Sequence, residues 1–260
     1  MIAPPDAPAT VCLFALDGLP GVTLDELDAL AERQTRTERK YLVSSEHLAA
    51  AMELLPVRPR VLDIDDRRRF RYESIYFDTP GFDSYLDAAR RRPQRFKVRT
   101  RTYVDAGRCW IEAKFRTRTG RTEKRRAEIA LGDGGRLSEE SLAFLDGFPL
   151  VRPHLAHLGP ALRTRYGRST LVLGSSRVTI DVDLDCSVPG RSAGGVGVGD
   201  LIIIETKGDR AVGDFDRALW SLHVRPSAIS KYGLGMAALH PHLPSNAWRR
   251  ILDRHVAPTL

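Results

Sequence analysis

Apolar and polar side chains alternate with a period of two over much of the chain, which is the pattern of β-strands. In RFKVRTRTY, Arg95 to Tyr103, a cation occupies every second position, and phenylalanine, valine and threonine stand between the cations. Similar segments predict strands over 37–43, 95–103, 108–118, 121–131, 162–173, 177–186 and 201–207, and in FRYESIYFD before Pro80. The short Thr-Gly turn at 119–120 joins two of these strands into a hairpin.

Helical periodicity lies outside these strands. A capping box, Thr23 with Glu26 three residues later, predicts a short helix from Leu24 to about 33. Further helices are predicted after Ser44 or Ser45, at 82–89, near 138–146, around 213–222 and after Ser245. The segment GRSAGGVGVG, 190–199, is typical of a flexible loop, and the first ten residues, rich in proline and alanine, are typical of a disordered tail.

One domain accounts for the main part of the chain. No repeat of fixed period and no shift in composition marks a second domain, and 42% hydrophobic residues suffice for a sizeable core. We therefore expect a tail and short helix over 1–34, a folded domain over 35–240 and a C-terminal helix over 241–260. The many strands and few helices predict an α+β fold.

Each strand separates into a charged row and an apolar row. The charged rows contain Glu38 and Lys40; Arg95, Lys97, Arg99 and Arg101; Glu112, Lys114, Arg116 and Arg118; Lys124, Arg126 and Glu128; Arg177, Asp181, Asp183 and Asp185; Glu205 and Lys207. Any one charged row is explained by an ordinary antiparallel sheet whose charged side faces solvent. Enclosed like charges roughly 7 Å apart cost about 2.4 kcal/mol per pair at an effective dielectric constant of 20, so an enclosed row needs carboxylates or a bound anion. Mixed signs on at least six strands favour a closed antiparallel β-barrel with a charged lumen and helices packed outside.

Such a lumen has the chemistry to hold phosphates. Arginine and lysine bind phosphate oxygens, and carboxylates hold a divalent metal that bridges them. The formal net charge of +7 and a pI near 9.6 also indicate a polyanionic partner. The three cysteines, widely spaced, support neither a disulfide framework nor a zinc site. With no signal peptide and no long apolar run, we expect a cytoplasmic protein without a membrane segment.

The order of these motifs resembles the triphosphate tunnel metalloenzymes, and within them the VTC-type polyphosphate polymerase domain. The similar segments, over about 36–236, are TERKYLV (Glu38, Lys40), VRTRTY (Arg99, Arg101), IEAK (Glu112, Lys114), TEKRR (Lys124), RYGRSTL (Arg168), RVTID (Arg177, Asp181), IIIETKG (Glu205, Lys207) and ISKYGLG (Lys231). Each motif alone is short and common, whereas their order along one chain is specific. The Ser-Lys-Tyr ending favours the polymerase branch.

The resemblance implies transfer of the γ-phosphoryl group of ATP to a growing inorganic polyphosphate chain, or to pyrophosphate, with Mn²⁺ or Mg²⁺ as cofactor. The residues implied to act on the triphosphate are Arg99, Arg101, Lys114, Lys124 and Arg168, with Lys231 near the acceptor or product. Residues implied to bind substrate are Lys40, Lys97, Arg126, Arg177 and Lys207. The implied metal ligand is Glu205, with Glu38 or Asp181 as a second.

One motif departs from the pattern. Arg168 has the opposite strand parity to Arg163 and Arg165, so the three cannot all face inward on a regular strand. A bulge at Gly167 would reconcile them, and we expect Arg168 inside.

Two other functions stay open. The same lumen could hydrolyse inorganic or organic triphosphates, with water replacing the acceptor phosphate. A barrel could also hold polyphosphate without catalysis. Nucleic acid is not expected, because aromatic residues are only 7% of the chain and are scarce in the charged rows.

Overall fold

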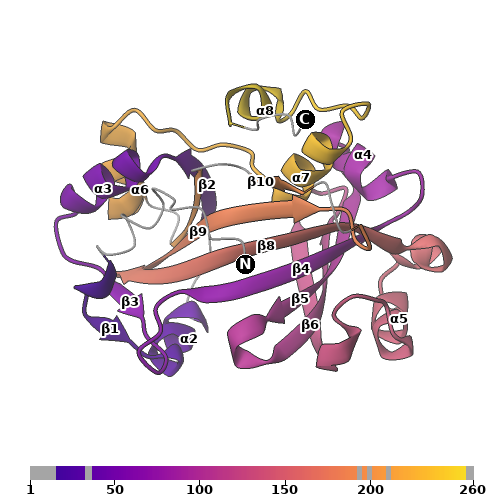
Figure 1. Ribbon diagram of the computed structural model, residues 1–260, viewed down its shortest axis with the longest axis horizontal. Helices are drawn as coiled ribbons and strands as arrows, with labels where there is room; N and C mark the ends of the chain where they lie inside the picture. The colour runs from indigo at the N-terminus through magenta and orange to yellow at the C-terminus, as the bar shows by residue number, and fades with distance from the viewer. Residues whose placement is uncertain (1–15, 33–36, 192–194, 198–200, 209–211, 256–260) are drawn as a thin grey trace, which may run out of the picture. The chain divides into compact units, whose positions relative to one another are not determined.

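The computed structural model describes residues 16–32, 37–191, 195–197, 201–208 and 212–255 (Figure 1). The strands are β1 (Gly21–Val22), β2 (Thr37–Val43), β3 (Arg60–Leu62), β4 (Phe70–Asp78), β5 (Arg95–Tyr103), β6 (Arg108–Arg116), β7 (Thr122–Ile129), β8 (Gly159–Leu173), β9 (Ser176–Ser187), β10 (Val196–Gly197) and β11 (Ile202–Gly208). The helices are α2 (Leu24–Glu32), α3 (Ser45–Glu53), α4 (Asp83–Ala89), α5 (Glu139–Asp146), α6 (Asp214–Ser221), α7 (Lys231–Leu239) and α8 (Arg249–His255), with 3₁₀ helices at Val104–Ala106, Leu131–Asp133 and Arg152–His157. Among the described helices, none combines the length and apolar character needed to cross a bilayer.

Hydrogen bonding orders the main strands as β2-β11-β9-β8-β4-β5-β6-β7. The registers described along this series are antiparallel, while the short β1 pairs parallel with β3. The predicted α+β class and antiparallel sheet are therefore confirmed. The order has β2 and β7 at its ends, and no described pairing joins these two strands, so closure into a barrel stays a prediction.

Contacts within the chain define two compact units. The first unit comprises Met1–Phe70, Gly167–Leu184 and Gly199–Ile229. In it, β11 pairs with β2 on one side and β9 on the other, and α3 and α6 contact each other beside these strands (Figure 1). Tyr41 and Ile204 from the strands and Leu219 from α6 lie in one core cluster, each with 0% exposure. The apolar rows of β2 and β11 are thus covered by helices, as the alternation predicts.

The second unit comprises Arg71–Tyr166, Asp185–Val198 and Ser230–Leu260. Here β4, β5, β6 and β7 pair in sequence order. Val98 and Ile111 from the strands pack in a fully buried cluster with Leu145 of α5. Helix α7 contacts both α4 and α8.

The strand registers place the charged rows of neighbouring strands on a common face within each unit. In the second unit, Arg99 lies opposite Glu112, and in the first unit Glu205 lies opposite both Lys40 and Thr179. Directly opposed residues of an antiparallel pair have side chains on the same side of the sheet. We call this side the charged face of each unit.

The main error of the sequence prediction concerns α7. The pattern predicts only two closing helices, around 213–222 and after Ser245, yet a third lies between them. Its glycines lower helix propensity. A Cβ added to Gly233 would lie 2.2 Å from the Trp248 ring, and one added to Gly235 would lie 2.8 Å from a Leu162 methyl. Close packing therefore requires these glycines and outweighs their local preference.

Smaller differences concern short strands. The sequence prediction omits β1, β3 and β10, which have only two or three residues each. Strand β10 lies within the segment 190–199 that was predicted to be a loop, and it pairs with β9. Residues 192–194 and 198–200 of that segment, and the predicted N-terminal tail, lie outside the described residues.

Candidate active site

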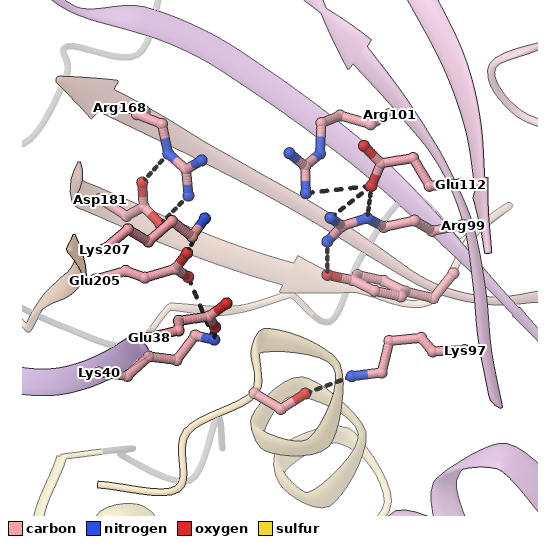
Figure 2. Close-up of polar contacts among 12 residues, drawn as sticks. Glu38, Lys40, Lys97, Arg99, Arg101, Glu112, Arg168, Asp181, Glu205 and Lys207 are labelled. Atoms are coloured by element: carbon pink, nitrogen blue, oxygen red, sulfur yellow. Dashed lines mark hydrogen bonds and ion pairs between the residues drawn. The ribbon is translucent and has the colours of Figure 1, made fainter. Parts of the chain in front are cut away.

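The charged face of the second unit carries one buried carboxylate among cations. We call this group the β5–β6 cluster: Lys97, Arg99, Arg101, Glu112 and Lys124. Glu112 is 2% exposed, and Arg99 donates to its Oε2 from Nε at 2.7 Å, with Nη2 at 2.6 Å (Figure 2). Arg101 Nη2 lies 3.5 Å from the same oxygen, and Lys124 Nζ donates to Oε1 at 2.7 Å. Four cations thus accompany one carboxylate.

Electrostatics keep this carboxylate ionised and leave positive charge over. Burial raises the pKa of Glu112, but Arg99 and Lys124 outweigh burial and hold the pKa at about 2. Burial lowers the pKa of Lys124, and Glu112 offsets part of that effect. Arg101 is 8% exposed, and its Nε has no hydrogen-bond partner among the described residues. Surplus charge and an unused buried donor equip the cluster to bind an anion.

Lys97 connects the cluster to helix α7. Its Nζ donates to Ser230 Oγ at 2.8 Å (Figure 2) and lies 5.4 Å from the ring centroid of Tyr232 and 6.0 Å from that of Tyr76. Arg99 Nη1 donates to the Tyr76 hydroxyl at 3.0 Å. Hydrogen bonding and cation–π attraction therefore fix the position of the Lys97 ammonium group.

Each residue of the Ser-Lys-Tyr triplet at the start of α7 makes a contact that the structure describes. Ser230 caps the helix, because its Oγ accepts a backbone N–H of the first turn at 3.2 Å. Tyr232, 1% exposed, donates its hydroxyl to Asp78. Lys231 Nζ lies 4.3 Å from the ring centroid of Tyr166 on β8. The neighbours of Lys231 thus fix the helix start from which its side chain extends.

Asp78 is the buried anchor of this arrangement. Its carboxylate accepts backbone N–H groups of Thr79 at 2.8 Å, Ser84 at 2.9 Å and Tyr85 at 2.9 Å in addition to the Tyr232 hydroxyl. Burial raises the pKa of Asp78, and the hydrogen bonds counteract that rise. Burial, together with Asp78, raises the pKa of Tyr232 far above its usual range, so the phenol stays protonated as a donor.

Two other predicted residues lie beside the cluster on the same face. Lys114 is exposed and lies opposite both Lys97 and Lys124 in the strand registers. The Arg126 guanidinium lies 4.5 Å from the ring centroid of Trp110. The structure therefore groups all the predicted residues of β5, β6 and β7 on one face.

The charged face of the first unit carries a second group. We call it the β11 cluster: Glu38, Lys40, Arg168, Asp181, Glu205 and Lys207. Glu205 accepts from Lys207 and lies 3.3 Å from Lys40 Nζ, which also donates to Glu38 (Figure 2). Burial raises the pKa of Glu205, but Lys207 and Lys40 outweigh burial and lower it well below its usual range. Burial lowers the pKa of Lys207, and Glu205 partly offsets this.

Arg168 and Asp181 form the other half of the β11 cluster. Arg168 donates to both carboxylate oxygens, from Nε at 2.5 Å and from Nη2 at 2.8 Å, and Asp181 is 1% exposed (Figure 2). Arg177 shares the charged face, because it lies opposite Lys207 in the register of β9 and β11. The cluster contains three cations and three carboxylates, so its charges balance.

The three arginines of β8 have different surroundings. Arg165 is 58% exposed and donates to Glu73 at 2.6 Å, on the side of β4 opposite to Tyr76. Arg163 donates to Ser187 Oγ at 3.1 Å. Arg165 therefore lies off the charged face, while Arg168 bonds to Asp181 as described above.

A divalent cation fits part of the β11 cluster. Glu205 and Glu38 both bind the Lys40 ammonium, and Thr179, opposite Glu205, is 5% exposed with no partner for its Oγ1 among the described residues. No group of three or more His, Cys, Asp or Glu side chains in the described part of the chain could hold a metal. Mg²⁺ commonly takes one or two carboxylates and completes its shell with water and substrate phosphates. These oxygens suit that mode of binding.

The sequence interpretation assigned no role to several residues in and around the charged faces. Tyr76, which bonds to Arg99, and Asp78 belong to the alternating row of β4, and that alternation was the available signal. Tyr232 was seen only as part of a triplet, and its bond to Asp78 joins residues far apart in the sequence. Thr179 does lie in the row of Arg177 and Asp181 that the alternation predicts, but nothing local distinguishes it from other strand threonines.

Comparisons with solved structures find distant matches. A putative adenylate cyclase from Bacillus halodurans is 16% identical with a TM-score of 0.48, covering 76% of this chain and 94% of its own. Another from Vibrio parahaemolyticus is 15% identical with a TM-score of 0.44, covering 77% and 98%. A putative adenylyl cyclase from Hippeastrum, described as having a dominant triphosphatase activity, is 15% identical with a TM-score of 0.47, covering 80% and 98%.

The family comparison is more direct. No curated protein matches the sequence. The family model described as the VTC domain matches residues 35–240, which include both charged clusters. Because this match spans most of the sequence, the chain belongs to the VTC domain family.

Proposed function

We propose that this protein is a metal-dependent polyphosphate polymerase, which transfers the γ-phosphoryl group of ATP to the end of an inorganic polyphosphate chain. The observation that carries the proposal is the β5–β6 cluster, in which Arg99, Arg101 and Lys124 share the buried Glu112 and Arg101 keeps an unused buried donor. A sheet face with that surplus charge is stabilised by a bound polyanion. Membership of the VTC domain family supports a triphosphate as that polyanion.

The residues divide the work of phosphoryl transfer, which depends mainly on positioning and neutralisation of charge. Arg99, Arg101, Lys114, Lys124 and Arg168 bind oxygens of the triphosphate. Lys97, Arg126, Arg177 and Lys207 add substrate contacts, and Lys40 and Lys231 direct the acceptor or product.

The chemical step needs no covalent enzyme intermediate. A terminal oxygen of the acceptor chain forms a bond to the γ-phosphorus, and the bond from that phosphorus to the β,γ-bridging oxygen breaks, releasing ADP. Glu205, with Glu38 as second carboxylate, is the ligand set for Mn²⁺ or Mg²⁺; Asp181 is the less suitable choice because Arg168 occupies both its oxygens. When bound, such a cation neutralises phosphate charge and polarises the transferring group.

Incubation with ATP and Mn²⁺, followed by gel analysis for long polyphosphate, tests the proposal. We expect polymer from the wild-type protein and none from Glu205→Ala. Arg165→Ala, which removes an exposed arginine off the charged face, is the matched control and should retain activity. Release of inorganic phosphate without polymer would instead identify a triphosphatase. Unchanged function in Glu205→Ala would favour a polyphosphate-binding module.

A further inference from the structure

The charged face of the second unit changes in composition from one end to the other. At one end, the register sets Arg95 opposite Arg116, and Lys114 lies opposite both Lys97 and Lys124. All five of these residues are cations. We call this the cationic end of the face, and its side chains can bind phosphate oxygens but offer no ring on which a base could stack.

Aromatic rings occupy the other end of the same face. Tyr103 and Tyr72 are directly opposed, with ring centroids 4.9 Å apart, and Tyr72 stacks on Tyr166 at 5.4 Å with an interplanar angle of 7°. Trp110 lies opposite Arg101 in the register. Tyr103 and Trp110 are only partly buried, so their rings retain accessible surface.

Guanidinium groups accompany these rings. The centroid of Trp110 lies 5.2 Å from Arg108 and 4.5 Å from Arg126. Arg108 is itself held by Glu128, which accepts from its Nε at 2.6 Å and its Nη2 at 2.7 Å. Aromatic rings and arginine planes are the groups on which nucleobases stack.

The spacing along β5 fits one nucleotide. Arg101, with its unused Nε, stands between Arg99 and Tyr103, two residues from each. A strand rises roughly 3.4 Å per residue, so about 7 Å separates successive side chains of this row. That distance allows a sugar to lie between a phosphate at Arg101 and a base at Tyr103.

Within the described part of the chain, the cationic end offers no equivalent ring for a base. Tyr76 and Tyr232 lie near Lys97, but they are 3% and 1% exposed, stack on each other at 4.9 Å and are covered by the Lys97 ammonium. Among the residues of this face that the structure describes, stacking surface for a base lies at the end formed by Tyr103 and Trp110.

We propose that this face recognises a nucleoside triphosphate in one orientation, with the base against Trp110 and Tyr103 and the γ-phosphate toward Lys97 and Lys114. The inference rests on the proposed function and adds to it a site for the base. The substrate is then a nucleotide rather than inorganic tripolyphosphate, and the acceptor chain approaches from the cationic end.

Binding measurements with two ligands test the orientation. Dissociation constants for ATP and for inorganic tripolyphosphate are measured by calorimetry on the full chain without metal, for wild type, Trp110→Leu and Tyr103→Leu. Loss of one stacking contact should weaken ATP binding roughly tenfold and leave tripolyphosphate binding unchanged. ATP should also quench tryptophan fluorescence in the wild type more than tripolyphosphate does, and Trp110→Leu should remove that difference.

The control is Trp220→Leu, which removes an indole that bonds to Tyr41 off the charged face and should leave the ATP to tripolyphosphate ratio unchanged. If Trp110→Leu fails to fold, Tyr103→Leu provides the same test. Equal weakening of both ligands, or no weakening of either, overturns the base site while leaving the triphosphate proposal standing. If neither ligand binds the wild type, the proposed function itself fails.

Discussion

The two charged clusters differ in how their charges balance. The β5–β6 cluster contains four cations and one carboxylate, Glu112, which pairs with three of them, whereas the β11 cluster contains three cations and three carboxylates. A surplus of cations attracts an anion more strongly than a balanced cluster does. The first cluster is therefore suited to hold phosphate as it stands, while the second must release a carboxylate from a lysine before that carboxylate can hold a metal.

The two clusters also differ in how strongly each carboxylate is fixed. Glu112 is 2% exposed and receives donors from two strands, so it cannot leave without exposing several cations to one another. Glu205 bonds to Lys207 and Lys40, whose side chains are 22% and 27% exposed. Glu112 is also held by two N–H groups of the planar Arg99 guanidinium, whereas the two ion pairs described for Glu205 are with lysines, whose flexible side chains each present one ammonium group. We therefore expect Glu112 to keep its partners and Glu205 to exchange a lysine for a metal.

The largest expected effect is on ATP turnover, and it comes from removing Arg101, whose buried Nε has no hydrogen-bond partner among the described residues. Arg101→Ala removes the buried guanidinium that carries the surplus charge, and turnover of ATP should fall by about 10²- to 10³-fold, the usual loss for one donor to a transition-state charge. Steady-state kinetics measure the loss. An Arg101→Ala protein with wild-type kcat/KM would remove the β5–β6 cluster from the reaction.

Removing the carboxylate instead should harm stability. Glu112→Ala leaves Arg99, Arg101 and Lys124 without their shared partner, and unfolding free energy should fall by about 3 kcal/mol, at the lower end for a broken buried pair because Lys124 is 43% exposed. Urea unfolding measures this, and added tripolyphosphate should restore part of the loss. Glu128→Ala, in an exposed pair with Arg108, is the control and should change stability by less than about 1 kcal/mol.

The β5–β6 cluster was largely predictable from sequence, and the β11 cluster less so. Strands β5, β6 and β7 follow one another, so alternation and one short turn give both the shared face and its members. The β11 cluster combines β2, β8, β9 and β11, and the pairing of Arg168 with Asp181 depends on registers that no local signal reveals. The Asp78–Tyr232 bond likewise depends on packing of α7 against β4.

The stability of the folded protein should depend on the ionisation of Glu112 at acid pH. The pKa of Glu112 is lowered in the folded state from its ordinary 4.5 to about 2, so its stabilising contribution is present above pH 4.5 and is lost as the pH falls toward 2. Glu112→Gln should flatten the dependence of unfolding free energy on pH in that window, measured by urea titrations at several pH values. An unaltered slope would show that Glu112 is not held by its cations.

The smallest expected effect tests the exchangeable carboxylate. In the proposed metal site, Lys207 occupies the same carboxylate that the cation would use, so Lys207→Ala should tighten Mn²⁺ binding in the absence of substrate by roughly tenfold, or about 1.4 kcal/mol. Electron paramagnetic resonance of free Mn²⁺ measures the binding. Arg39→Ala, which removes a cation bonded to Asp216 instead, should leave Mn²⁺ affinity as it is. Weaker Mn²⁺ binding in Lys207→Ala would mean that the lysine supports the metal site rather than blocking it, and the contrast between a fixed Glu112 and an exchangeable Glu205 would then be wrong.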